Sequence, residues 1–220
     1  MSSDDALTIA SKYIKISKKR KEEAAIFIIN RFLSDYADEN FALFSSFLPD
    51  SSLARIAKYK KEDDRRRSLL AEYTVRKVLS EILEKDEKEI EIKRSGNGKP
   101  FVENENIFFS VAHSENLVTV AFDDKNIGVD CEKIKNINLK TLDVAFTEDE
   151  KAFVLKDLTT SDIPREDTLA RFYTVWTAKE ARIKFLGSNM SDIKTESYLD
   201  YAPNCATFRE KGYVITAFRK

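Results

Sequence analysis

The chain has 220 residues, of which 42% are apolar, so it is long enough to bury one large core or two small ones. Its 37 basic and 38 acidic residues leave a formal charge of -1, which predicts no nucleic-acid partner and no attraction to an anionic membrane. Cys131 and Cys205 form neither a disulfide framework nor a paired zinc motif, and Met1–Lys12 lacks a leader-like apolar run, so we expect a cytoplasmic protein without membrane spans.

The first half of the chain contains two apolar patterns. Ala24–Asn30 is an apolar run of strand length, but its pattern does not separate a buried strand from a helix. Asp63–Glu84 is predicted to be a helix, because acidic residues crowd its start and apolar residues recur at helical spacing: Ala71, Val75, Val78 and Ile82. Arg67 lies on the same stripe, one turn before Ala71.

Three strands are predicted in the middle of the chain. They are Phe108–Val111, Leu117–Phe122 and Ile127–Glu132. The turn-prone residues Asp123–Asn126 join the last two, so we expect those two strands to form a hairpin.

The last part of the chain is predicted to hold a helix and a hairpin. The helix covers Leu169–Leu186 and ends at Gly187. Cys205–Glu210 and Tyr213–Phe218 form the closing hairpin around a short turn that contains glycine.

Two carboxylates lie on one face of the strand Ile127–Glu132. Strand alternation sends Asp130 and Glu132 to one side, roughly 6.6 Å apart along the strand, and Cys131 to the other. Gly128 shares the carboxylate face, where its missing side chain leaves room for a ligand. An acidic strand face in water explains the same pattern, and this segment alone does not decide between the two.

A third carboxylate is aimed at the protein interior. Glu180 falls inside the apolar stripe of its helix, about 40° from Trp176. An unpaired buried carboxylate costs several kcal/mol, so Glu180 needs a cation, a hydrogen-bond network or a shifted pKa. Either an ion pair with Lys184 one turn later or a metal shared with Asp130 and Glu132 meets that need.

Three carboxylates form an all-oxygen ligand set, which suits Mg²⁺. His113 is the single histidine of the chain, so a multi-histidine zinc site is excluded. His113 itself is either a hydrogen-bonded loop residue or a donor to an anion. Gly96–Pro100 lacks the spacing of a phosphate-binding P-loop and is predicted to be a turn.

Five short strings occur in a recognisable order between Phe41 and Gly187. They are Gly98-Lys99-Pro100, His113-Ser114, Gly128-Val129-Asp130-Cys131-Glu132, Phe146-Thr147-Glu148-Asp149-Glu150, and Trp176-Thr177-Ala178-Lys179-Glu180 with Lys184. In order and spacing, this set resembles the 4'-phosphopantetheinyl transferases of the surfactin-synthetase-activating type.

The resemblance implies an α/β (α+β) fold of two similar halves, residues 1–123 and 124–220, related by a pseudo-twofold axis with coenzyme A in the cleft between them. The strings VTVAF at 118–122 and VITAF at 214–218 then have a common origin. The implied reaction moves 4'-phosphopantetheine from coenzyme A to a serine of an apo acyl or peptidyl carrier protein. The enzyme is expected to be a monomer.

The resemblance also implies a role for each matched residue. Asp130, Glu132 and Glu180 hold Mg²⁺, and Glu180 is the candidate base beside Lys184. The cofactor-binding residues are Arg67 and His113 at the 3'-phosphate, Gly98, Lys99 and Pro100 along the adenine, Ser114, and Lys179 with Lys184 at the phosphate oxygens.

Two departures from the family pattern concern cofactor binding. Ala112 stands where the family has serine, and the basic residues expected after Phe47-Leu48-Pro49 align poorly, so Arg55 or Lys58 is the candidate substitute. Two other functions stay open at this point: a different Mg²⁺-dependent phosphotransferase or phosphohydrolase, and a non-catalytic module that binds coenzyme A or a carrier protein.

Overall fold

The computed structural model describes residues 27–138, 140–156 and 166–220. The expectation for Met1–Lys12 and the start of the Ala24–Asn30 run lie outside these residues. Within the described ranges, no helix combines the length and apolar character needed to cross a bilayer.

The first half of the molecule has a strand, several helices and a hairpin. In chain order its elements are β1 (Phe27–Phe32), the 3₁₀ turn η1 (Leu33–Asp35), α2 (Asp38–Ser46), α3 (Asp50–Ile56), α4 (Glu62–Leu83), β2 (Lys93–Arg94), β3 (Pro100–Phe101), β4 (Phe108–Ser114) and β5 (Leu117–Asp123). The described part of the Ala24–Asn30 run, from Phe27 onward, is a strand. The helix predicted for Asp63–Glu84 is confirmed as α4.

The second half begins with a strand and ends with a hairpin. Its elements are β6 (Ile127–Lys133), α5 (Lys140–Ala145), α6 (Glu148–Leu155), α7 (Glu166–Leu186), η2 (Met190–Asp192), α8 (Tyr198–Tyr201), η3 (Ala202–Asn204), β7 (Cys205–Glu210) and β8 (Tyr213–Arg219). The helix ending at Gly187 is confirmed, and this glycine has a φ of 67° that suits the end of a helix. The closing hairpin is confirmed as β7–β8.

The two halves repeat one topology. In each half a strand leads to a long helix, and a hairpin follows whose second strand lies in the middle of an antiparallel sheet: β1-β5-β4 in the first half and β6-β8-β7 in the second. The similar strings at 118–122 and 214–218 lie on the two central strands, β5 and β8. The two similar strings therefore occupy equivalent positions in the repeated topology.

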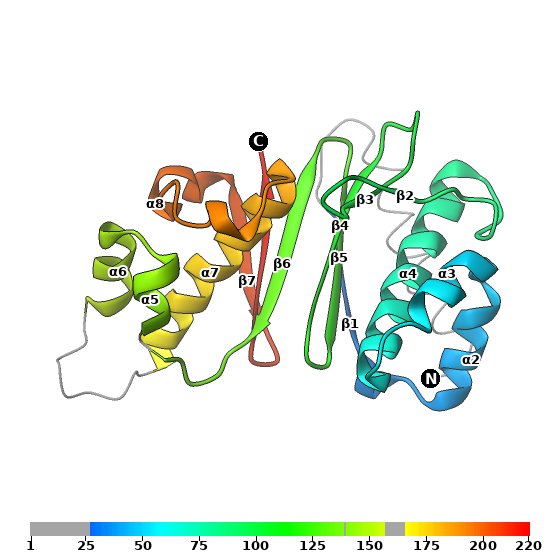
Figure 1. Cartoon of the computed structure of the whole chain (residues 1–220), viewed down its shortest axis with the longest axis horizontal. Helices are drawn as coiled ribbons and strands as arrows, with labels where there is room; N and C mark the ends of the chain where they lie inside the picture. The colour runs from blue at the N-terminus through cyan, green and yellow to red at the C-terminus, as the bar shows by residue number, and fades with distance from the viewer. Residues whose placement is uncertain (1–26, 139, 157–165) are drawn as a thin grey trace.

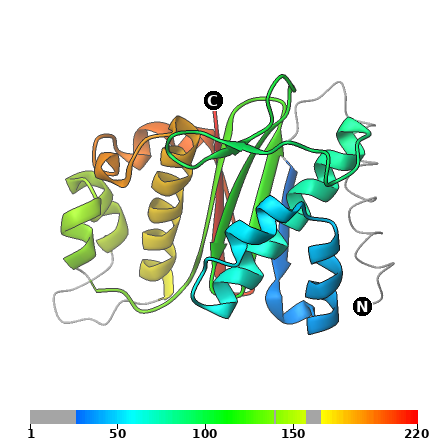
Figure 2. The same ribbon diagram turned by 45° about the vertical axis from the view of Figure 1, so that its right-hand side comes forward.

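Four layers build the molecule, and Figure 1 shows them as helices, sheet, sheet and helices. Figure 2 shows α2, α3 and α4 on one side of the strands and α5 to α8 on the other. Alternation along β5 explains the layering, because Val118 and Val120 pack in the core with α4 while Leu117 and Ala121 face the second sheet. Both faces of the central strands are covered, so they consist of nearly continuous apolar residues.

The apolar layer between the sheets belongs to both halves. Phe32, Leu117 and Ala121 meet Val129 and Ile215 in one buried cluster. Neither half could be exposed at this face without uncovering large apolar side chains, so the two halves stabilise each other.

The predicted hairpin of Leu117–Phe122 with Ile127–Glu132 is wrong. Among the described strands no ladder joins β5 to β6, since β5 pairs with β1 and β4 while β6 pairs with β8. A strand has only two edges, and both edges of β5 are already occupied. The short turn after β5 therefore carries the chain across to the second sheet.

Candidate functional site

Strand β6 and helix α7 bring three carboxylates together. Asp130, Glu132 and Glu180 each offer an oxygen atom, and these oxygens all lie within 4.8 Å of one another. Asp130 is only 4% exposed, while the other two are half-buried. The face of β6 that carries the two acidic residues is the face covered by α7, which explains how residues 48 to 50 positions apart in the chain meet.

Gly128 has a different role from the expected one. A Cβ atom at this position would lie 1.9 Å from the carbonyl oxygen of Ala181 and 2.6 Å from the amide nitrogen of Phe185. The missing side chain therefore makes room for the backbone of α7, and the expectation that it leaves space for a ligand is wrong. This close approach brings α7, and Glu180 with it, onto the carboxylate face of β6.

The ion pair between Glu180 and Lys184, one of the two alternatives considered from the sequence, is not the one that Lys184 forms. The ammonium of Lys184 donates to Oδ1 of Asp130 at 2.8 Å, and Ser114 donates to Oε2 of Glu132 at 2.7 Å. Oδ2 of Asp130 is buried and has no hydrogen-bond partner among the described residues. A buried carboxylate oxygen without a donor is unfavourable unless a further group satisfies it.

Electrostatics at the cluster favour a cation. Burial raises the pKa of Glu180 to about 7, with Asp130 and Glu132 adding to the rise and Lys184 opposing it. Burial also raises the pKa of Asp130 and of Glu132. The three carboxylates carry more negative charge than Lys184 alone offsets, and Oδ2 of Asp130 still lacks a hydrogen-bond donor among the described residues. This arrangement suits a hard divalent ion such as Mg²⁺, which takes oxygen ligands.

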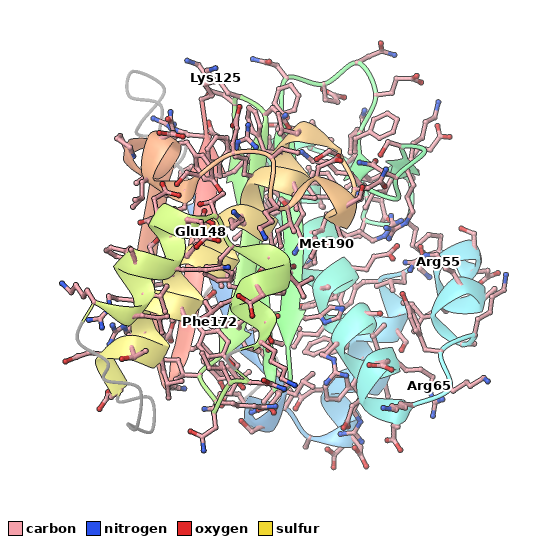
Figure 3. The ribbon with its side chains drawn as sticks, turned by 60° about the vertical axis from the view of Figure 1, so that its left-hand side comes forward. Arg55, Arg65, Lys125, Glu148, Phe172 and Met190 are labelled. Carbon is pink, nitrogen blue, oxygen red and sulfur yellow. The ribbon has the colours of Figure 1, made fainter. Side chains whose placement is uncertain are left out.

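A pocket of about 510 Å³ opens beside this cluster, lined by both halves of the molecule. The second half contributes Glu180 and Lys184 from α7 and Met190 from η2. Figure 3 labels Met190 together with Arg55, which lines the pocket from α3 on the other side.

Five of the predicted cofactor-binding residues line the pocket: Gly98, Lys99, Pro100, His113 and Lys184. Gly98 has a φ of 84° and lies in the turn between β2 and β3, as expected for a tight turn. Desolvation, followed by the charges of Arg67 and Lys184, lowers the pKa of His113. A neutral imidazole next to two cations becomes a better donor to an anion once that anion arrives and favours its protonated form.

The ammonium of Lys99 is turned toward the protein. It donates to Oδ1 of Asn126 at 2.6 Å and to the carbonyl oxygen of Ile127 at 2.9 Å, and burial lowers its pKa to about 8. Asn126 in turn donates to the carbonyl oxygen of Phe185. Lys99 therefore ties the β2–β3 turn to the connection between the two halves.

Three other predicted binding residues lie outside the pocket lining: Arg67, Ser114 and Lys179. The guanidinium of Arg67 is bonded to Asp64 and to the carbonyl oxygen of Glu115. The hydroxyl of Ser114 is engaged by Glu132 and by the amide of Lys133. Apart from the buried Nε of Arg67, the polar atoms of these two side chains already have protein partners, so a direct cofactor contact by either residue stays a prediction that requires one of these hydrogen bonds to be exchanged.

Lys179 points into the second half and away from the pocket. Its ammonium donates to both oxygens of Glu150, at 2.8 and 2.7 Å, and only 1% of the lysine side chain is exposed. The expectation that Lys179 neutralises phosphate is wrong here, because adjacent helix residues project about 100° apart and Glu180 takes the direction of the pocket.

Two arginines supply positive charge on the wall formed by the first half. Arg55, one of the two substitutes considered from the sequence, is held by Glu72, whereas Lys58 is exposed outside the lining. Arg94 was missed, although its position just before the Gly96–Pro100 turn could have drawn attention to it. Burial, followed by the charge of Arg55, lowers the pKa of Arg94, so an anion between the two guanidinium groups is favoured.

Comparison with known proteins gives the same family for both halves. A family model described as "4'-phosphopantetheinyl transferase, N-terminal" matches residues 36–125, and one described as "4'-phosphopantetheinyl transferase superfamily" matches residues 126–208. Together these matches cover most of the described chain.

Several curated relatives are named 4'-phosphopantetheinyl transferases. The gsp protein of Aneurinibacillus migulanus is 30% identical over 68% of this chain and 60% of its own length, and psf-1 of Bacillus pumilus is 36% identical over 58% and 53%. Sfp of Bacillus subtilis strain 168 is 30% identical over 74% of this chain and 69% of its own length. The chain thus spans between half and two thirds of the first two relatives. Both halves and the similarity to Sfp lead to one conclusion: the chain belongs to the 4'-phosphopantetheinyl transferase superfamily.

Proposed function

We propose that this protein transfers 4'-phosphopantetheine from coenzyme A to a serine of an apo acyl or peptidyl carrier protein, leaving 3',5'-adenosine diphosphate. The observation that carries the proposal is the meeting of three carboxylates, Asp130, Glu132 and Glu180, beside a pocket lined by both halves. In this proposal the halves are residues 1–123 and 124–220, and coenzyme A occupies the pocket between them.

The charges of the pocket match a ligand with two anionic groups. Arg55 and Arg94 lie in the wall of the first half, and His113 lines the same pocket. We assign these three residues to the 3'-phosphate of coenzyme A, with Arg55 and Arg94 in place of Arg67. Glu180 and Lys184, which line the other wall, are assigned to the pyrophosphate together with the adjoining carboxylates of Asp130 and Glu132.

Asp130, Glu132 and Glu180 would hold Mg²⁺, which when bound offsets the negative charge that develops on the pyrophosphate as the bond to phosphorus breaks. Lys184 is anchored on Asp130 and adds a positive charge at the same edge of the pocket. Glu180 opens into the pocket and is the candidate acceptor for the proton of the carrier serine. The serine oxygen then forms the new bond to the β-phosphorus, and the nucleotide leaves.

The turn Gly98-Lys99-Pro100 completes the pocket on the side assigned to the adenine. Gly98 and Pro100 present backbone and ring surface there, while the side chain of Lys99 holds the turn in place through Asn126. Binding of the cofactor thus depends on contacts with both halves. The cytoplasmic location and the monomeric state expected from the sequence stay predictions.

The test is to incubate the whole protein with coenzyme A, Mg²⁺ and several purified apo-carrier proteins, and to weigh the carriers by mass spectrometry. We expect one phosphopantetheinyl group to be added, with loss of the reaction in Glu180→Gln or after chelation of the metal. Glu166→Gln, an exposed glutamate in the first turn of the same helix, is the matched control. Cleavage of coenzyme A without transfer to any carrier would instead support a phosphohydrolase.

A further inference from the structure

Strands β4 and β6 face each other at the seam between the two sheets. Each is an edge strand of its own sheet, and they are in contact although no ladder joins them within the described residues. Edge strands carry backbone N–H groups that need acceptors. Two serine hydroxyls of β4 meet this need: Ser110 accepts from the amide of Val129 at 3.0 Å, and Ser114 accepts from the amide of Lys133 at 3.2 Å.

Ser114 has a second contact that links the seam to the acidic cluster. Its hydroxyl donates to Oε2 of Glu132 at 2.7 Å, and Ser114 is only 9% exposed. A serine hydroxyl has one proton to donate, so the bond accepted from Lys133 leaves that proton directed at Glu132. Ser110 shares the strand and the bond to β6, but it has no carboxylate contact among the described residues.

Glu132 needs such a restraint more than its neighbours do. Asp130 is held by Lys184 and is almost fully buried, whereas Glu132 is half-buried and has a longer, more flexible side chain. Repulsion from Asp130 and Glu180 pushes the Glu132 carboxylate away from the cluster while no cation is bound. Hydrogen bonds from neighbouring residues hold metal-binding carboxylates in place and reduce the ordering that binding requires.

We propose that Ser114 is a positioning residue of the metal site, whose hydroxyl keeps the Glu132 carboxylate turned toward Asp130 and Glu180 instead of contacting coenzyme A. This inference rests on the proposed function in one respect, since it requires that the three carboxylates bind a divalent cation. It also gives the seam a function, because the same hydroxyl joins β4 of the first half to the metal-binding strand of the second.

The experiment measures binding of Mn²⁺ to the whole protein by electron paramagnetic resonance, without coenzyme A and without turnover. Four proteins are compared: wild type, Ser114→Ala, Ser110→Ala and Glu132→Gln, followed by the double variant with Ser114→Ala and Glu132→Gln. The control Ser110→Ala removes the other seam hydroxyl from the same strand by the same chemical change. Thermal unfolding of each variant shows how much stability each hydroxyl contributes.

We expect Ser114→Ala to weaken Mn²⁺ binding about three- to tenfold and Ser110→Ala to change it less than twofold. In the Glu132→Gln background, Ser114→Ala should have no further effect, because the carboxylate that it positions is gone. A general loosening of the seam would instead weaken binding in that background as well, through Asp130 and Glu180, and would overturn the inference. Equal effects of the two serine variants would overturn it too. Absence of Mn²⁺ binding by the wild type would show that the metal site of the proposed function is wrong, and the inference with it.

Discussion

The buried ion pair between Glu150 and Lys179 provides the sharpest test of how α7 is held in place. Glu150 is fully buried, and it accepts four hydrogen bonds: two from the Lys179 ammonium and one each from the amides of Thr147 and Tyr198, at 2.8 and 2.6 Å. It thereby joins the start of α6, the middle of α7 and the start of α8. We expect Glu150→Gln to loosen all three connections at once.

The magnitude follows from the charge left behind. Removing one partner of a buried ion pair costs about 3–5 kcal/mol, because the remaining ion is uncompensated. Glutamine keeps one acceptor oxygen and turns an amide donor toward the former partners, so the loss falls within that range. A domain of this kind has about 5–15 kcal/mol of unfolding free energy in total, so the variant should be severely destabilised. Adding Lys179→Met removes the stranded charge and should recover about half of the loss.

The dependence on pH gives an independent check. Burial already lowers the pKa of Lys179, and loss of Glu150 lowers it further. Between that lowered value and the pKa of about 10.4 in the unfolded chain, the unfolded state binds more protons than the folded state. The unfolding free energy of Glu150→Gln should therefore rise with pH up to about 10, and its deficit relative to wild type should shrink.

The assay is urea unfolding followed by the fluorescence of Trp176, the single tryptophan, whose ring stacks on Phe146 and Phe172. Glu148→Gln is the control, since that side chain is 87% exposed on the same helix and should show no measurable change. The reasoning fails if Glu150→Gln unfolds at the same urea concentration as Glu148→Gln, or if adding Lys179→Met makes the protein still less stable.

Three further predictions concern the pocket and the carboxylates. Arg55→Ala and Arg94→Ala should each raise the KM for coenzyme A about tenfold or more, as expected for a lost charge-assisted hydrogen bond. Neither variant should have much effect on the KM for 3'-dephospho-coenzyme A. Equal effects on both substrates in steady-state kinetics would refute the assignment to the 3'-phosphate. Gly128→Ala should destabilise the protein by about 2 kcal/mol or more in urea unfolding, because the new methyl group meets the backbone of α7, while Gly96→Ala, with nothing within 4 Å, should not. Mg²⁺ affinity measured by calorimetry should rise between about pH 6 and 8, because a proton competes for Glu180 with its pKa of about 7, and Glu180→Gln should flatten this rise; an unchanged slope in that variant would show that another group titrates.

Local patterns in the chain were sufficient for the two long helices, for five of the strands and for part of the site, whereas the shorter helices and the strands β2 and β3 were not predicted. Helical spacing predicted α4 and α7, and alternation along β6 placed Asp130 and Glu132 on one face, because these periods follow from backbone geometry alone. The direction of Glu180 followed from the apolar stripe of its helix. Residues whose neighbours in space are also near in sequence were therefore predictable.

The strand that β6 pairs with, the ion pairs that the lysines form and the space beside Gly128 were decided only by the tertiary structure. Strand β6 does not pair with β5, because β4, which directly precedes β5, occupies one edge of β5 and β1, from far earlier in the chain, occupies the other. Lys184 pairs with Asp130, and Lys179 pairs with Glu150. In both cases the packing of distant segments brings the carboxylate within reach of the ammonium, and the position of the lysine in its helix does not specify that partner. Gly128 serves the approach of α7 for the same reason. The sequence determines which groups a residue carries and which way it points, whereas the packing of distant segments determines what it meets there.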